Sequence, residues 1–161
     1  MGCASSSAPL ALSRREGLGG LLACLCLAGK PVRAQAPPVN LDWPALYTPH
    51  TGGQIPTAAK VLVETPRLAD NGLSVPLKIS IDHPMRQDNF IKRVVLLSNR
   101  NPRTLIAEFE LSPWAGKAEI ATRVRLNGSQ EVMALAQGVD GRWWEGRAQV
   151  EVTESACLDE A

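Results

Sequence analysis

The sequence has few of the residues that enzymes use for acid–base or nucleophilic chemistry. It contains only two histidines, His50 and His83, and each stands next to a proline. The G-x-S-x-G and H-E-x-x-H motifs are absent, and Gly52-Gly53 is too short to form a phosphate-binding loop. We therefore do not expect the chain to be an enzyme in its own right.

A long apolar run is also lacking. The N-terminal apolar segment, 18–27, is far shorter than the ~20 residues that a membrane-spanning helix needs. It follows Arg14 and Arg15, and it is followed by a small-residue cleavage site formed by Ala34 and Ala36. Residues 1–36 are therefore predicted to be a cleavable export signal, and no membrane association is expected after cleavage.

The arginine pair indicates the export route. The stretch "SRREGL", residues 13–18, is similar to the twin-arginine motif that precedes a modest apolar segment in bacterial signals. An ordinary secretory signal is one alternative. A lipoprotein signal, in which Cys24 at the end of "LLAC" would be lipidated, is another. The twin-arginine reading predicts a periplasmic protein that is exported folded.

The rest of the chain has no large excess of positive or negative charge. Residues 37–161 hold 13 basic and 15 acidic residues, a net charge of −2, and the two signs are interspersed. No basic stripe is available to attract a phosphate backbone. Nucleic acid is therefore excluded as a partner.

Cysteine is scarce once the signal is removed. Three of the four cysteines lie within residues 1–36, which leaves Cys157 near the C-terminus. A single cysteine in an oxidising, exported compartment indicates a reactive thiol or an intermolecular disulfide. A small buried side chain is the alternative. The acidic neighbours Glu154, Asp159 and Glu160 favour exposure.

Between the lead-in and the tail, short apolar segments alternate with turns. Residues 73–82 are apolar at every second position, the pattern of a strand buried on one face. Residues 91–100 are the most apolar run and are predicted to form a central strand. Asp140-Gly141 predicts a hairpin, because both positions tolerate a positive φ. The expected strands are 60–65, 73–82, 91–100, 104–111, 118–126, 131–137 and 143–153.

Three further expectations concern individual segments. Residues 67–72, "RLADNG", are predicted to be a turn. In 104–111 the side chains at 105, 107, 109 and 111 are expected to point inward. Trp143 and Trp144 must point to opposite faces of their strand, so one is expected in the core and the other at the rim or on a partner.

Together these features predict an all-β fold, an immunoglobulin-like antiparallel β-sandwich of about seven strands. The domain boundaries follow from the segments above. The signal covers 1–36, and an irregular lead-in, 37–58, is expected to pack Trp43 and Leu46 on the body through one helical turn. The sandwich covers 59–153, and a C-terminal arm, 154–161, carries Cys157.

A copper site needs separate consideration, because such sites occur on β-sandwiches. His50, His83, Cys157, Met85 and Met133 supply the residue types of a blue-copper centre. In those centres, however, one loop supplies cysteine, histidine and methionine within a few residues. Residues 158–161, "LDEA", contain neither histidine nor methionine. We therefore expect no metal site.

Several segments together resemble the SoxY family, the sulfur carriers of periplasmic thiosulfate oxidation. The similarity includes "SRREGL", "VLVETPRLADNGLSVPLKISIDHP", "VVLLSNRNPRTLIAEFEL", "AEIATRVRLNGSQEVMALAQ" and "DGRWWEGRAQVEVT". The most specific features are the Asn-Pro after the central strand, the T-R-x-R strand, and the D-G-x-W-W hairpin that leads into V-x-V-T. The resemblance extends over nearly the whole chain.

The resemblance implies an immunoglobulin-like domain that pairs with a SoxZ-like sandwich subunit, docked beside the last strands. It also implies that Cys157 is the covalent attachment point for sulfur, without a further cofactor. A haem protein would attach thiosulfate, and other sulfur-oxidation enzymes would release sulfate and oxidise the remaining sulfur. A module that keeps the sandwich for structural or binding purposes alone is the alternative.

The arm departs from the family pattern. The family's G-G-C-G-G is replaced by Ser155-Ala156-Cys157-Leu158-Asp159. Glycine allows more backbone conformations than alanine or leucine. Acidic flanks disfavour a thiolate and repel anionic thiosulfate. The flanks therefore suggest that this chain carries a different sulfur cargo, or serves different enzymes, than the carriers of the family.

Overall fold

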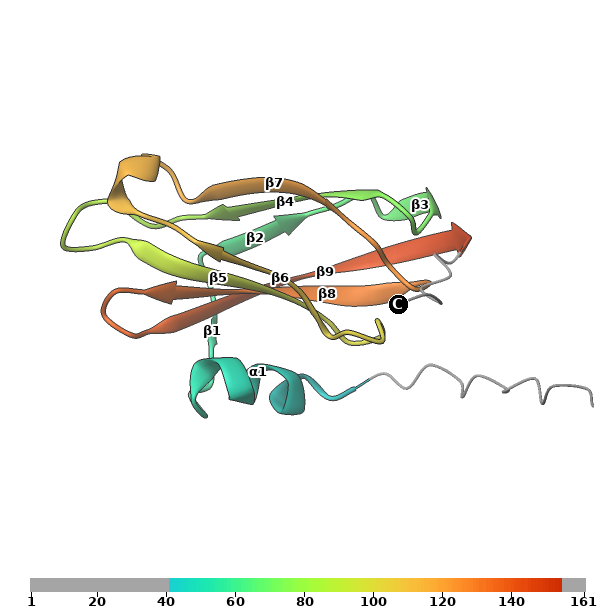
Figure 1. Ribbon diagram of the computed structural model, residues 1–161, viewed down its shortest axis with the longest axis horizontal. Coiled ribbons are helices and arrows are strands. Elements are labelled where there is room, and N and C mark those ends of the chain that lie inside the picture. Colours follow the sequence, from blue (N-terminus) through green and yellow to red (C-terminus); the bar gives the residue numbers. More distant parts are fainter. Residues whose placement is uncertain (1–40, 155–161) are drawn as a thin grey trace, which may run out of the picture. The chain divides into compact units, whose positions relative to one another are not determined.

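The computed structural model describes residues 41–154, which form two packed β-sheets and one α-helix (Figure 1). One sheet has the strand order β1-β9-β8-β5-β6, with β3 also paired to β9, and the other has the order β2-β4-β7. This confirms the predicted all-β sandwich. The elements are α1 Trp43–Thr51, β1 Thr57–Ala58, β2 Val61–Glu64, β3 Leu68–Asn71, β4 Val75–Ile81, β5 Ile91–Ser98, β6 Leu105–Glu110, the 3-10 helix η1 Pro113–Ala115, β7 Glu119–Val124, β8 Gln130–Gly138 and β9 Trp143–Glu154.

The two strands beyond the expected seven are β1 and β3, and both pair with β9 in parallel. The prediction of a turn at 67–72 was therefore wrong. Leu68 aligns with Glu151 and Asn71 with Glu154, so β3 forms on a strand about eighty residues away in the chain. A partner so distant leaves no local pattern, whereas the Asp and Asn in this segment do suggest a turn.

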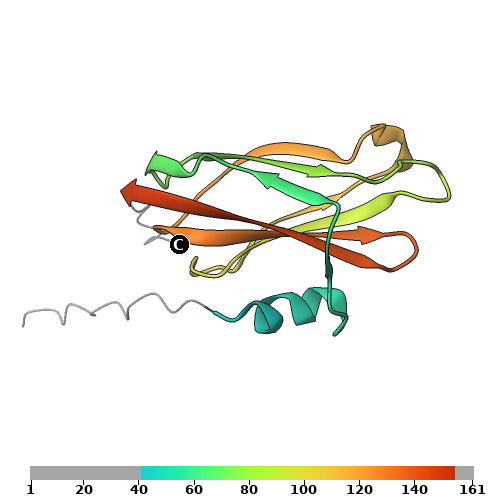
Figure 2. The same cartoon turned by 180° about the vertical axis from the view of Figure 1, so that it is seen from behind.

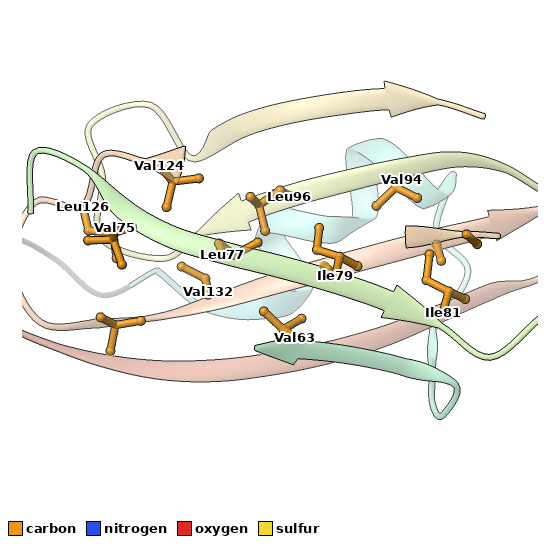
Figure 3. Packing of buried hydrophobic residues seen from close by; sticks show 14 of the residues in the cluster. Val63, Val75, Leu77, Ile79, Ile81, Val94, Leu96, Val124, Leu126 and Val132 are labelled. Atoms are coloured by element: carbon orange, nitrogen blue, oxygen red, sulfur yellow. The ribbon is translucent and has the colours of Figure 1, made fainter. Parts of the chain in front are cut away.

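The main core lies between the two sheets and follows the predicted alternation. On β4 every second residue, from Val75 to Ile81, is buried (Figure 3). The apolar run of β5 is flanked by β8 and β6, as expected for an interior strand. Because sheets bury side chains from both inner faces, Leu96 and Val132 of the larger sheet meet the β4 side chains there, and Val63 lies beside them on the neighbouring β2 (Figure 3).

One inward position was predicted incorrectly. The register between β5 and β6 shifts between Leu96 and Leu97, which pair with Ala107 and Leu105. The extra residue on β6 is Ile106, which packs against the core, while Leu105 is 41% exposed. A β-bulge of this kind reverses the facing of the residues before it.

The outer face of the larger sheet is covered at one end by α1 (Figures 1 and 2). Trp43, Leu46 and Tyr47 pack on a second apolar cluster that includes Leu97, Met133, Leu135 and Trp143. The expected packing of Trp43 and Leu46 is confirmed, but the helix has nine residues where one turn was expected. A proline stands in the first turn of the helix, and Gly52, with φ 64°, caps its C-terminus. Both features favour a short helix.

Because α1 lies on the sheet, neither adjacent tryptophan is at a rim. Trp143 is 4% exposed beneath α1, and Trp144 is 5% exposed in the main core. The opposite facing was predicted correctly and the exposed position was wrong. The Trp43 indole N–H donates to Glu131 Oε2 at 2.6 Å, and the Arg147 guanidinium lies 5.4 Å from the Trp43 ring, so polar contacts also fix the helix.

The end of the sandwich at the β8–β9 hairpin is closed around Trp144. The His83 ring meets the Trp144 ring edge-on at 5.2 Å, and Lys60 Nζ lies 4.9 Å from the Trp144 ring centre. The predicted hairpin is present here, with the Gly141 N–H donating to Gly138 O at 3.0 Å. Both His83 ring nitrogens are buried without a hydrogen-bond partner among the described residues.

Gly146 should not tolerate a side chain. A Cβ at this position would lie 2.8 Å from the carbonyl carbon of Val61 and closer still to its oxygen, so the backbones of β9 and β2 would have to separate. We expect Gly146→Ala to lower the free energy of unfolding by about 1–3 kcal/mol, the usual range for overpacking. Urea denaturation measures this.

Gln149→Ala, at an exposed position of the same strand, is the matched control for Gly146→Ala. It should change the free energy of unfolding by less than about 0.5 kcal/mol. Equal stability of the Gly146→Ala variant and the unsubstituted protein would show that the two strands are not in close contact.

His83 should make the fold sensitive to mild acid. Burial lowers the pKa of His83 below 6.5, and Lys60 lowers it further. The unfolded chain then binds a proton more readily than the folded chain. The stabilising contribution of neutral His83 is complete above pH 6.5 and is lost as the pH falls through its lower folded pKa. We expect the urea midpoint to fall as the pH is lowered through this window.

His83→Phe keeps an aromatic ring against Trp144 and cannot be protonated, so its urea midpoint should fall less over the same window. The pKa of His50 is also lowered, first by burial and then by Arg93, so His50→Phe should remove a separate part of the dependence. A His83→Phe variant with an unchanged pH profile would contradict the assignment.

Candidate functional site

The residues that the sequence singled out for chemistry and export lie outside residues 41–154. They are Cys157 in the tail and Arg14, Arg15, Cys24, Ala34 and Ala36 in the N-terminal segment. The part of the site that the structure does describe is the end of β9, from which the chain continues to Cys157. Figure 1 shows β3 beside this end of β9.

The end of β9 is held on one side by β3. The Glu151 N–H donates to Arg67 O at 2.8 Å, and the Gly72 N–H donates to Glu154 O at 2.8 Å. The Thr153 hydroxyl adds a bond to Asp70 O. The backbone is therefore fixed up to Glu154, the last residue of the strand.

The edge of β9 that pairs with β8 is also held beyond the last β8–β9 residue pair. The β8–β9 pairing stops at Gln130 and Val150. Ser129 then continues the ladder with its side chain, since its Oγ accepts from the Val152 N–H at 2.9 Å and lies 3.3 Å from Val152 O. A side-chain hydroxyl thus extends the support of β9 by two residues.

A buried polar network fixes the loop that carries Ser129. Gln130 is 3% exposed, and its amide donates to Asn101 Oδ1 at 2.9 Å and accepts from the Ser98 hydroxyl. Asn101 in turn accepts from the Asn127 N–H at 2.9 Å and donates to Arg125 O at 2.8 Å. Since these groups satisfy one another, the β5–β6 and β7–β8 loops are locked together.

Sequence reasoning missed Ser129, Gln130 and the other members of this network. The Asn101-Pro102 pair was noted there only as part of the family resemblance. The partners lie about thirty residues apart in the chain, as with Ser98 and Gln130. No local spacing rule could have related them, although several polar residues next to strand ends were a general signal for loop contacts.

The fixed position of Glu154 limits where the Cys157 thiol can lie. Cys157 is the third residue after Glu154, and a fully extended chain spans at most about 3.6 Å per residue. The α-carbon of Cys157 is therefore within about 11 Å of that of Glu154. A reaction at this thiol takes place close to the end of the sandwich.

The candidate copper ligands within the described residues occupy different parts of the fold. Met133 is fully buried beneath α1, whereas Met85 packs against the main core on the other face of the sheet. His50 is in the last turn of α1, and His83 lies against Trp144. Within 41–154, no group of three or more metal-binding side chains from His, Cys, Asp and Glu comes together.

No helix within residues 41–154 combines the length and the apolar character that a bilayer crossing requires.

Solved structures share this architecture at low sequence identity. The sulfur carrier protein SoxY from Chlorobium limicola f thiosulfatophilum matches with a TM-score of 0.58 and 18% identity, over 68% of this chain and 90% of the other. The superoxide reductase (neelaredoxin) from Ignicoccus hospitalis matches with a TM-score of 0.53 and 16% identity, over 58% and 80%. That from Nanoarchaeum equitans has a TM-score of 0.51 and 15% identity, over 60% and 100%. At these identities the likeness shows the fold.

The family comparison is more specific. A search of curated proteins found no match. The family model described as "Sulfur oxidation protein SoxY" matches residues 49–157, more than half of the 161 residues, and its match extends to Cys157. The chain therefore belongs to the SoxY family of sulfur oxidation proteins.

Proposed function

We propose that this protein is a periplasmic sulfur carrier that holds sulfur intermediates covalently on Cys157 and is acted on by partner enzymes. The observation that carries the proposal is the position of this cysteine. It lies within the family match and three residues beyond Glu154, where the support of β9 ends. A solved structure of similar fold is also described as a sulfur carrier.

The chemistry of loading requires a partner. Joining the Cys157 thiol to the terminal sulfur of thiosulfate forms a disulfide bond and releases one proton and two electrons. A haem protein would accept these electrons, because no redox centre is part of the proposed carrier. Hydrolysis of the S–SO₃ bond by water then releases sulfate and two protons and leaves a persulfide anion on Cys157.

The compact body explains why such a carrier needs no active site of its own. The described residues form a packed core and a polar network around Gln130 and Asn101. Cys157, tethered to Glu154, would react near one end of the sandwich. Twin-arginine export through Arg14 and Arg15, with cleavage after Ala36, would deliver this folded body to the periplasm.

A SoxZ-like sandwich subunit is the proposed structural partner. The outer face of the larger sheet is already covered by α1 at Trp143. A subunit docked beside the last strands would therefore contact the half of β8 and β9 nearer Glu154. This half carries exposed Gln149 and Glu151.

Cys157 should carry sulfur in the protein purified from its host. In cells supplied with thiosulfate, we expect intact-protein and peptide mass spectrometry to show additions of one S₂O₃ unit and of single sulfur atoms on Cys157. Reducing agents should remove the additions, because each is attached through a sulfur–sulfur bond. Cys157→Ser should abolish both the additions and thiosulfate oxidation.

A matched test separates transport from a binding role. Ala156→Gly with Leu158→Gly keeps the thiol and restores small flanks, so it should retain the additions and transfer sulfur at least as fast. A free thiol or a disulfide-linked partner in the unsubstituted protein, with full activity in Cys157→Ser, would instead indicate a purely structural module.

A further inference from the structure

Arginine side chains gather at the end of the sandwich where β9 ends. Arg123 Nη1 lies 3.3 Å from the carbonyl oxygen of Ser74, close to the Gly72 that binds Glu154. Arg125 precedes Leu126, whose N–H donates to Gly72 O at 2.8 Å. Arg100 Nη1 donates to Ser129 O at 2.8 Å. We call Arg100, Arg123 and Arg125 the arginine rim.

The positive charge of the rim is not cancelled by ion pairs with described residues. Within 41–154, the ion pairs involve Lys78, Arg93, Arg142 and Arg147, and none involves a rim arginine. Arg123 and Arg125 are exposed. The Nε of Arg100 is buried without a hydrogen-bond partner in the same residues, so one rim donor is unsatisfied as well.

Carboxylates at this end oppose the rim but do not outnumber the arginines. Asp70, Glu151 and Glu154 lie on β3 and β9. Arg67 and Arg103, at the start of β3 and in the β5–β6 loop, add to the three rim arginines. Among these named side chains the arginines exceed the carboxylates by two; Glu131 on β8, opposite Gln149, is a further carboxylate and is ion-paired with Arg147. The tail itself is acidic, with Asp159 and Glu160.

At low ionic strength the rim lies within electrostatic range of the thiol. Cys157 is tethered within about 11 Å of Glu154, which is comparable with the screening length of about 8 Å at physiological salt and well within the roughly 30 Å at 0.01 M salt. Guanidinium groups bind oxyanions through paired N–H donors and remain charged at every relevant pH. Positive potential at this end would also offset the acidic flanks of Cys157, which otherwise repel an anionic reagent.

We propose that the arginine rim attracts small sulfur oxyanions to the Cys157 thiol. This proposal rests on the proposed carrier function, since it assumes that Cys157 reacts with such anions. The rim acts as a steering and binding site on the body, and no bond to an arginine forms or breaks. The rim would therefore favour the loading of Cys157 with an anion, which the acidic tail alone would disfavour.

The experiment compares two thiol reagents of different charge. Ellman's reagent is a dianionic aromatic disulfide, and a dithiodipyridine is a neutral counterpart. The ratio of their rate constants reports the electrostatic attraction, because general changes in thiol exposure affect both reagents. Loss of the reaction in Cys157→Ala assigns the measured rate to this thiol. Thiosulfate, added as a competitor, tests whether the native anion occupies the same region.

Arg123→Gln and Arg125→Gln should each lower the anionic-to-neutral rate ratio by about fourfold at low ionic strength, the effect of one charge on a dianion at about 10 Å in water. Glu151→Gln, on the same end with the opposite sign, should raise the ratio. Arg86→Gln is the matched control. Arg86 lies near Phe90, whose carbonyl oxygen accepts a hydrogen bond from the β8–β9 hairpin. This hairpin is at the opposite end of β9 from Glu154, about 35 Å away along the twelve-residue strand.

Added salt should reduce the differences among the variants, because it screens the charges. Equal ratios in the unsubstituted, Arg123→Gln and Arg125→Gln proteins would overturn the proposal, even if Cys157 carries sulfur in the host. A rim effect on the reagents together with a Cys157 that never carries sulfur would uphold the attraction and refute the carrier function. The two failures are therefore distinguishable.

Discussion

The backbone hydrogen bond from the Gly72 N–H to Glu154 O is the contact on which the rest of the account depends. It joins the β3–β4 turn to the last residue of β9, and Gly72 O accepts in turn from the Leu126 N–H. Three segments far apart in the chain thus meet at one residue. Because this point is fixed, the chain that follows starts from a defined place, and the thiol of Cys157 has a limited reach.

The support at this point comes from polar groups, whereas the body is held by apolar packing. Ser129 continues a ladder that β8 no longer provides, and the network of Ser98, Asn101 and Gln130 fixes the loop that carries Ser129. Burying these groups is favourable only when they satisfy one another. The same end of the fold presents arginines to solvent, so rigidity and charge coincide at the point from which the chain continues to Cys157.

The sequence patterns predicted what depends on near neighbours in the chain. The alternation in 75–81 gave β4, and Asp140-Gly141 gave the hairpin before β9. Features that depend on distant partners were missed: β3 needs β9, and the burial of Trp143 needs α1. The bulge that exposes Leu105 depends on the local pairing with β5. Cys157 was identified as the sole cysteine after the predicted signal, but no local spacing in the sequence related Ser129 to β9.

The central claim is that the body is held in place up to Glu154, the residue from which Cys157 is tethered. Amide hydrogen exchange of the protein, resolved by residue, tests it most directly. The account predicts that the amides of Gly72, Glu151 and Val152 exchange as slowly as those of β8. Fast exchange at Gly72 and Val152 would contradict it.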